Sequence, residues 1–254
     1  TSPNSTGLSA MGAAQLGVAK GEAPENLVKG QNITIRGFSS DVAASQIAVG
    51  FEESAKAIAE KISQQAGRSG VSATAKTTLT LEEVYNSSVA GAQSISFRLY
   101  GANVKQGFDT TNAANVLASI EGTTRDGLKN LVSAINKETV KTGITASFIE
   151  EDASNGPRIE LVQEDGEDIS IEEFSNASGN EDPFVDSTML ATGSQGTERI
   201  KLSEGGTEDS MTVGGIVTFH SYKAFKVTSD AVECESLFNS AAEGTLQGAE
   251  FSSL

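Results

Sequence analysis

The chain has 254 residues, of which 37% are hydrophobic and only 6% aromatic, and its formal net charge is −16. This length suits one large or two ordinary domains, and the absence of any Lys/Arg cluster argues against binding to nucleic acid or to an anionic membrane. A single cysteine excludes a disulfide within the chain, and no apolar run is long enough to cross a membrane.

The N-terminal segment shows little hydrophobic patterning. We therefore expect residues 1–31 to be a lead-in segment. The chain opens with TSPNST rather than with Met, so we expect it to be a fragment or a processed product. Ile33 and Ile35 then alternate with polar residues up to Gly37, which predicts a short strand. Residues 47–49 predict a second strand.

Residues 51–66 change to the periodicity of an amphipathic helix. Lys56 lies four positions from both Glu52 and Glu60, a spacing that supports ion pairs on the polar face of a helix. The expected apolar face consists of Phe51, Ala55, Ile58, Ala59, Ile62 and Ala66.

The end of this helix is marked by glycine. Gly67 and Gly70 can end it, because glycine adopts the left-handed conformation at little cost. Alternation from Val71 to Leu81 then predicts a half-buried strand.

The same order of elements occurs a second time. Residues 127–148 align without a gap on residues 54–75, and residues 95–101 match the first strand in style. Thr123 and Asp126 have the spacing of a capping box at the start of the second helix. The stripe of that helix and the strand behind it are expected to contain Leu128, Leu131, Val132, Ile135, Gly143 and Ile144.

The remainder of the chain is rich in predicted strands. We expect the acidic, turn-rich residues 164–186 to form exposed loops. We also expect a short helix near residues 232–242. Further strands are expected at 158–163, 169–171, 200–202 and within 215–229. The prediction is therefore an α+β fold of small, mostly antiparallel sheets, each covered by an amphipathic helix, with two tandem similar units and a strand-rich remainder.

The repeated pattern resembles the IN motif of bacterial flagellins and hook-associated proteins. The second copy (95–148) contains the Ile-Asn pair that gives the motif its name, and the first copy (33–75) has Ile-Ser in its place. The resemblance implies structural roles for Ile33, Ile35, Gly37, Ile58, Ile62, Gly70 and Val71 in the first copy, and for Leu128, Leu131, Ile135, Asn136, Gly143 and Ile144 in the second.

The resemblance implies the central, surface-exposed and antigenically variable region of a flagellin, a secreted structural protein of the extracellular filament that serves motility. The terminal helical regions would be missing, and self-assembly would run through them. It also allows O-linked glycans and contacts with host surfaces or antibodies. A hook-associated or filament-cap protein is an alternative in the same apparatus, and an extracellular adhesive or glycan-binding module is an alternative of another class.

The implied domain arrangement follows from the need for both chain ends to return to the filament core. Residues 1–31 would lead in from that core. Residues 32–90 and 192–254 would form the proximal subdomain, and residues 91–191 the distal subdomain inserted into it.

The sequence points to no catalytic chemistry, cofactor or metal. The single histidine, His220, lies in an alternating run and is expected to be a plain strand residue, and no nucleophile elbow or phosphate-binding glycine loop occurs. Cys234 is expected to be an incidental thiol. Residues 150–152 and 164–168 offer carboxylates to Ca²⁺ but lack the EF-hand spacing, so we expect solvated loops, while a glycosidase pair of carboxylates stays open.

Overall fold

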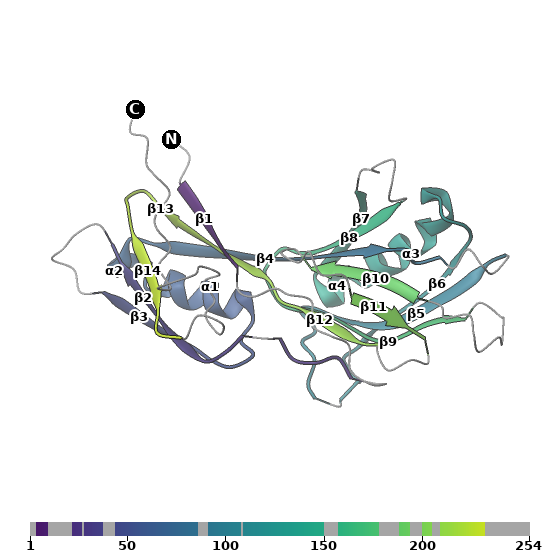
Figure 1. The fold of residues 1–254 in the computed structure, drawn as a ribbon, viewed down its shortest axis with the longest axis horizontal. Helices are drawn as coiled ribbons and strands as arrows, with labels where there is room; N and C mark the ends of the chain where they lie inside the picture. The colour runs from purple at the N-terminus through teal and green to yellow at the C-terminus, as the bar shows by residue number, and fades with distance from the viewer. Residues whose placement is uncertain are drawn as a thin grey trace.

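The computed structural model of the chain describes residues 4–9, 22–26, 28–37, 44–85, 91–107, 109–149, 157–177, 188–193, 200–204 and 209–231. The molecule is elongated, and its elements form two groups along the long axis (Figure 1). We name the group around α1 the first unit and the group around α3 the second unit.

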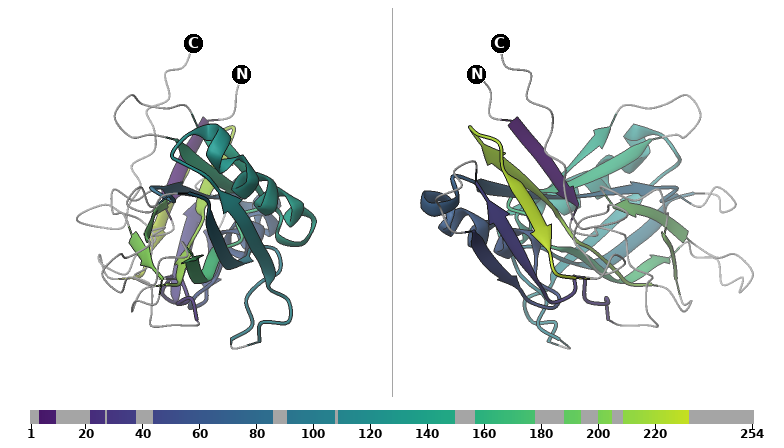
Figure 2. Two further views of the ribbon diagram at one scale, coloured as in Figure 1. Left: turned by 90° about the vertical axis from the view of Figure 1, so that its right-hand side faces the viewer. Right: turned by 60° about the vertical axis from the view of Figure 1, so that its left-hand side comes forward.

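The first unit contains the first copy of the repeat. Its elements are β1 (Asn4–Ser9), β2 (Gln31–Arg36), β3 (Ser45–Val49), α1 (Ala55–Gln64), α2 (Ala66–Ser69), β13 (Ile216–Ser221) and β14 (Lys226–Ser229). β14, β2 and β3 form a three-stranded antiparallel sheet. The first and last described strands, β1 and β14, therefore both belong to this unit (Figure 2).

The second unit contains the second copy. Its elements are β5 (Gln93–Tyr100), β6 (Ala114–Ile120), α3 (Arg125–Lys137), α4 (Thr139–Thr142), β7 (Ile144–Ile149), β8 (Arg158–Gln163), β9 (Ile169–Ala177), β10 (Thr188–Gly193), β11 (Ile200–Ser203) and β12 (Met211–Val213). β12, β9, β5 and β6 form a four-stranded antiparallel sheet.

One long strand joins the two units. β4 (Ser72–Glu82) pairs with β13 through residues 72–76 and with β8 and β10 through residues 77–82. The resulting seven-stranded sheet runs β1-β13-β4-β10-β11, with β8 also joined to β4 and β7 joined to β8. All paired strands in the described part of the chain are antiparallel, so the predicted α+β class is confirmed.

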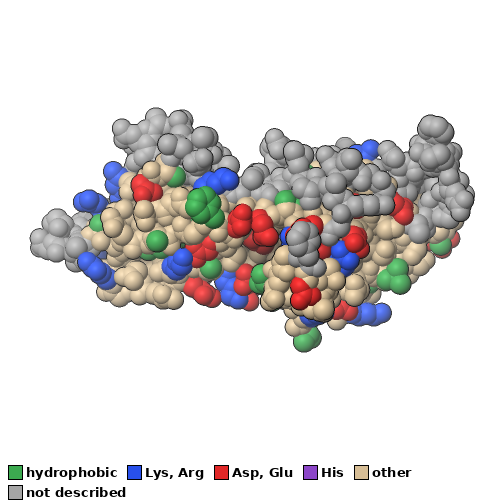
Figure 3. All heavy atoms as spheres, turned by 90° about the horizontal axis from the view of Figure 1, so that it is seen from below, with side chains coloured by type: hydrophobic (Ala, Val, Ile, Leu, Met, Phe, Trp, Pro, Cys, Tyr) green, Lys and Arg blue, Asp and Glu red, His purple; other side chains and the backbone are tan. Residues whose placement is uncertain are grey.

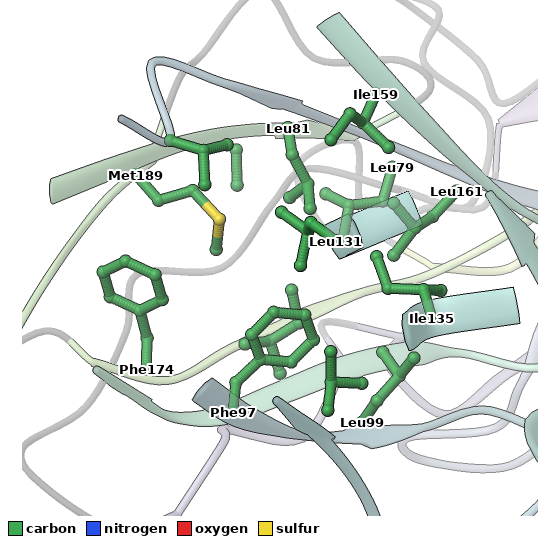
Figure 4. Close-up of a cluster of buried hydrophobic side chains, with 14 of the residues drawn as sticks. Leu79, Leu81, Phe97, Leu99, Leu131, Ile135, Ile159, Leu161, Phe174 and Met189 are labelled. Carbon is green, nitrogen blue, oxygen red and sulfur yellow. The ribbon is translucent and has the colours of Figure 1, made fainter. Parts of the chain in front are cut away.

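Each unit buries its own set of hydrophobic side chains. The first core contains Ile33, Ile35, Ile58, Ile62 and Val71 together with Val28, Ile47, Val49, Ala55, Ala59, Val217, Phe219 and Val227. In the second core, Leu131 and Ile135 of α3 meet residues of β4, β5, β8 and β9 (Figure 4). Aliphatic residues dominate both cores, as the low aromatic content requires.

The predicted subdomain boundaries at residues 90/91 and 191/192 stay a prediction. The two hydrophobic cores divide the chain differently from the predicted subdomains. Leu79 and Leu81 of β4, and Ile200 and Leu202 of β11, fall in the predicted proximal subdomain but pack in the second core. They do so because β4 extends past the first unit and pairs with β10 there.

Three local expectations for the helices were wrong. α1 begins only at Ala55, and Phe51 is 72% exposed instead of lying on its apolar face. Lys56 pairs with Glu167 at 3.1 Å instead of with Glu52 or Glu60, because a turn of the second unit lies against it. The N-cap of α3 is Thr124, one residue after the expected Thr123.

The acidic segment was also only partly an exposed loop. Glu164 and Asp165 are exposed, but Gly166 is buried, and residues from Ile169 to Ala177 form β9. The predicted helix at 232–242, Cys234 and the acidic residues 150–152 lie outside the described residues.

Candidate functional site

The two copies of the repeat begin their helices in the same way. The Ser54 hydroxyl accepts a hydrogen bond from the Ala57 amide (3.3 Å), and the Thr124 hydroxyl accepts one from the Gly127 amide (3.2 Å). A hydroxyl at this position satisfies one of the backbone donors left free at a helix start. Both helices therefore begin with a side-chain hydroxyl as their N-cap.

The helices also end in the same way. Each is followed by one short helical turn and then by a glycine in the left-handed conformation, Gly70 (φ 70°) and Gly143 (φ 68°). Just before it, the Ser69 hydroxyl accepts from the Val71 amide (3.1 Å) and the Thr142 hydroxyl accepts from the Ile144 amide (3.1 Å). This turn reverses the chain, so that the next strand runs back along the helix.

A polar side chain of each helix holds that returning strand. Asn136 donates to the Ala146 carbonyl (2.9 Å) and accepts from the Ala146 amide (2.7 Å). Ser63 makes the same two bonds with Ala73, at 3.0 and 2.9 Å. Ser63, which takes the place of Asn136 in the first copy, therefore makes the same pair of hydrogen bonds to the returning strand.

A second glycine in each copy permits close backbone packing. A Cβ added to Gly37 would collide with the Ser69 carbonyl oxygen, and one added to Gly101 would collide with the Thr142 carbonyl oxygen. The Ala102 amide donates to the Thr142 carbonyl at 2.7 Å, which fixes this contact in the second unit. The first strand of each copy is thereby packed against the turn that ends the helix.

The structure thus gathers the predicted motif residues into two equivalent sites, one in each unit. Their apolar members are buried in the respective cores, and Gly70 and Gly143 lie at the turn between helix and strand. Gly37 follows β2 and packs against that turn, while Asn136 is in the last turn of α3. Ser63, Ser69 and Thr142 were not among the predicted site residues. The gapless alignment could have identified them, because it pairs a small polar residue with another at both positions.

The left-handed glycines give a first testable prediction. Gly143→Ala is expected to lower the free energy of unfolding by about 1–2 kcal/mol, because L-residues other than Asn and Asp rarely adopt this conformation. Gly70→Ala is expected to cost less than Gly143→Ala, since an added Cβ meets nothing within 4 Å at Gly70 but meets Gln163 Nε2 at 3.1 Å at Gly143. Urea unfolding of both variants would measure this, and equal costs would contradict the prediction.

Two polar side chains of β13, His220 and Ser221, have partners within the fold. His220 Nε2 lies 2.8 Å from the Thr74 hydroxyl, and the neighbouring Ser221 hydroxyl donates to the Gly70 carbonyl (2.9 Å). In the described part of the chain, no group of three or more His, Cys, Asp or Glu side chains could hold a metal ion. The expected absence of catalysis, cofactor and metal stays a prediction.

No helix among the described residues is both long and apolar enough to span a membrane. The face shown in Figure 3 carries both acidic and basic side chains, and its hydrophobic side chains are scattered over it.

Comparison with known proteins supports the motif. Residues 104–164 match the family model described as "Flagellin hook IN motif", so the predicted resemblance is confirmed over the second copy. This match covers less than half of the chain and supports a structural protein of the bacterial flagellum. No curated protein sequence matches the chain.

Two solved structures of a flagellar cap protein are similar to a small degree. The chain is 12% identical to the D2-D3 domains of the cap protein FliD from Escherichia coli, over 90% of this chain and 100% of that one, with a TM-score of 0.24. For the D1-D2-D3 domains of the same protein, the identity is 10% over 87% of this chain and 57% of the other, with a TM-score of 0.21.

Proposed function

We propose that this chain is the outward-projecting region of a flagellin, a secreted structural component of the flagellar filament that serves motility and catalyses no reaction. The observation that carries the proposal is the flagellin hook IN motif over residues 104–164. The same helix-to-strand construction in the first unit supports it, because both units then use one structural device.

The arrangement of the chain suits a projecting arm. β1 and β14 lie in the first unit, so the described chain enters and leaves on the same side, and the second unit extends beyond it. Polymerisation would be carried by helical regions outside this sequence. A net charge of −16 would keep the arm soluble at the high local density of a filament surface.

A hook-associated or filament-cap protein is the second candidate, because the matching motif is described for flagellin and hook proteins together. Both candidates share the proposed extracellular location and the absence of nucleic-acid and membrane partners. O-glycans, antibody contacts and host-surface contacts belong to the proposed exposed surface. An adhesive or glycan-binding module is the candidate from another class.

Immunogold electron microscopy of the source cells, with an antibody raised against this chain, tests the proposal. We expect label along the whole filament, since a flagellin is present in every turn of the filament. Cells in which the gene is deleted provide the control for antibody specificity.

The position of the label separates the candidates. Label only at the filament tip would replace the proposal with a cap protein, and label at the filament base would replace it with a hook-associated protein. Label on the cell body beside bare filaments would overturn the flagellar role and favour an adhesive module.

A further inference from the structure

The turn between β8 and β9 lies against the start of α1, so that it joins the two units. We name residues 164–168 the junction turn. The Lys56 amide at the start of α1 donates to the Gly166 carbonyl at 3.0 Å, and the Lys56 ammonium pairs with Glu167 at 3.1 Å. A Cβ added to Gly166 would collide with Ala75 of β4, so the turn and the first unit are in close contact.

Asn26 connects the junction turn to the first unit a second time. Its Nδ2 donates to Asp168 Oδ2 (2.6 Å) and to the Glu52 carbonyl (3.1 Å), and its Oδ1 accepts from the Val28 amide (2.9 Å). The amide group of Asn26 therefore bridges three separate segments of the chain at the junction.

Only one of the two carboxyl oxygens of Asp168, Oδ2, has a hydrogen-bond partner among the described residues. Its Oδ1 is shielded from solvent and has no hydrogen-bond partner among the described residues. A carboxylate oxygen that is buried without a donor is costly, whereas a protonated carboxyl group carries no charge.

Other charged groups face Asp168 from the neighbouring segments. Glu25 approaches on the same segment as Asn26, and Glu167 precedes Asp168 in the junction turn. Glu167 is paired with Lys56, and Glu25 with Lys105 Nζ at 3.5 Å. Burial raises the pKa of Asp168 to about 7; the Asn26 hydrogen bond lowers it in part, and the charges of Glu167 and Glu25 raise it further.

We propose that the junction turn is a proton-controlled latch between the two units, closed while Asp168 carries a proton and loosened when its carboxyl group ionises. This inference concerns the contact between the units and does not depend on the proposed function. The ligand that controls the contact is a proton bound to Asp168. The contact that opens is the one between the junction turn and α1.

The direction of the pH effect follows from the raised pKa. A carboxyl group whose pKa is higher in the closed state than its ordinary value of 3.8 stabilises that state most at low pH. The contribution is complete below 3.8 and is lost as the pH rises through about 7. The latch therefore weakens between acidic and mildly alkaline conditions.

Amide hydrogen exchange on the full chain tests the latch. The readout is a peptide that contains Lys56 but not residue 168, compared at each pH between the wild type and Asp168→Asn. Because the two proteins share the sequence of this peptide, the chemical exchange rate cancels, and the ratio of their rates reports opening alone. We expect the wild-type rate relative to the variant to rise by about tenfold or more from about pH 5.5 to about pH 8.5.

Asp165→Asn is the matched control, because it removes one exposed carboxylate from the same turn. Its exchange rate relative to the wild type is expected to stay constant over the same pH range. A constant ratio for Asp168→Asn would overturn the proposal. So would the same pH dependence in the Asp165→Asn comparison, because it would point to general charge repulsion.

Discussion

Replacing Gly101 with alanine is expected to lower the free energy of unfolding by about 2–4 kcal/mol. The new Cβ would collide with the backbone carbonyl oxygen of Thr142 and would lie 3.0 Å from Ile144 Cδ1. The carbonyl cannot move away easily, because it accepts the hydrogen bond from the Ala102 amide at 2.7 Å. Strand β5 and the turn after α3 would have to separate.

Urea denaturation with a fitted midpoint measures this effect, and Gly37→Ala provides the same test in the first unit. Gly67→Ala is the matched control: it lies in α2, and an added Cβ meets nothing within 4 Å. Alanine at that helical position is expected to stabilise the protein by about 0.5–1 kcal/mol. A Gly101→Ala protein as stable as the wild type would show that the close approach is not required.

Replacing Asn136 with alanine is expected to cost about 2 kcal/mol. The substitution leaves the amide and the carbonyl of Ala146 without the partners that now lie at 2.7 and 2.9 Å. Because the Asn136 side chain itself is exposed, the cost comes from these two backbone groups rather than from lost packing. Thermal and urea unfolding of the full chain would measure it.

Asn136→Asp is the control that separates the two hydrogen bonds. A carboxylate can still accept from the Ala146 amide but cannot donate to the Ala146 carbonyl. We expect Asn136→Asp to lower the free energy of unfolding relative to the wild type, but by less than Asn136→Ala does. If Asn136→Ala were neutral, the name-giving asparagine of the motif would have no structural role in this chain.

The repeat and most of its elements could be predicted from the sequence because the signals are local. Helical spacing of Ile58 and Ile62, the glycine at position 70 and the alternation after it all act over a few residues. Strand β6 was not predicted, since its buried positions include the small residues Ala114 and Ala118, which give a weak hydrophobic signal.

Long-range contacts were not accessible in the same way. Asn26 and Asp168 are 142 positions apart, and nothing in either local sequence marks them as partners. The acidic residues around Gly166 have the composition of a solvated loop, and only the fold brings part of them against α1. The partner of Lys56 was predicted wrongly for the same reason: helical spacing favours Glu60, while tertiary structure supplies Glu167.

The hydrogen bonds from Asn136 and Ser63 also bear on association between molecules. Among the described strands β7 pairs with β8 alone, and the helix side chain occupies backbone groups that a foreign strand would otherwise use. An unpaired strand edge is a template for aggregation. In the filament that we propose, the chain would lie beside many copies of itself, and Asn136 in the second unit and Ser63 in the first would then limit lateral growth of a β-sheet.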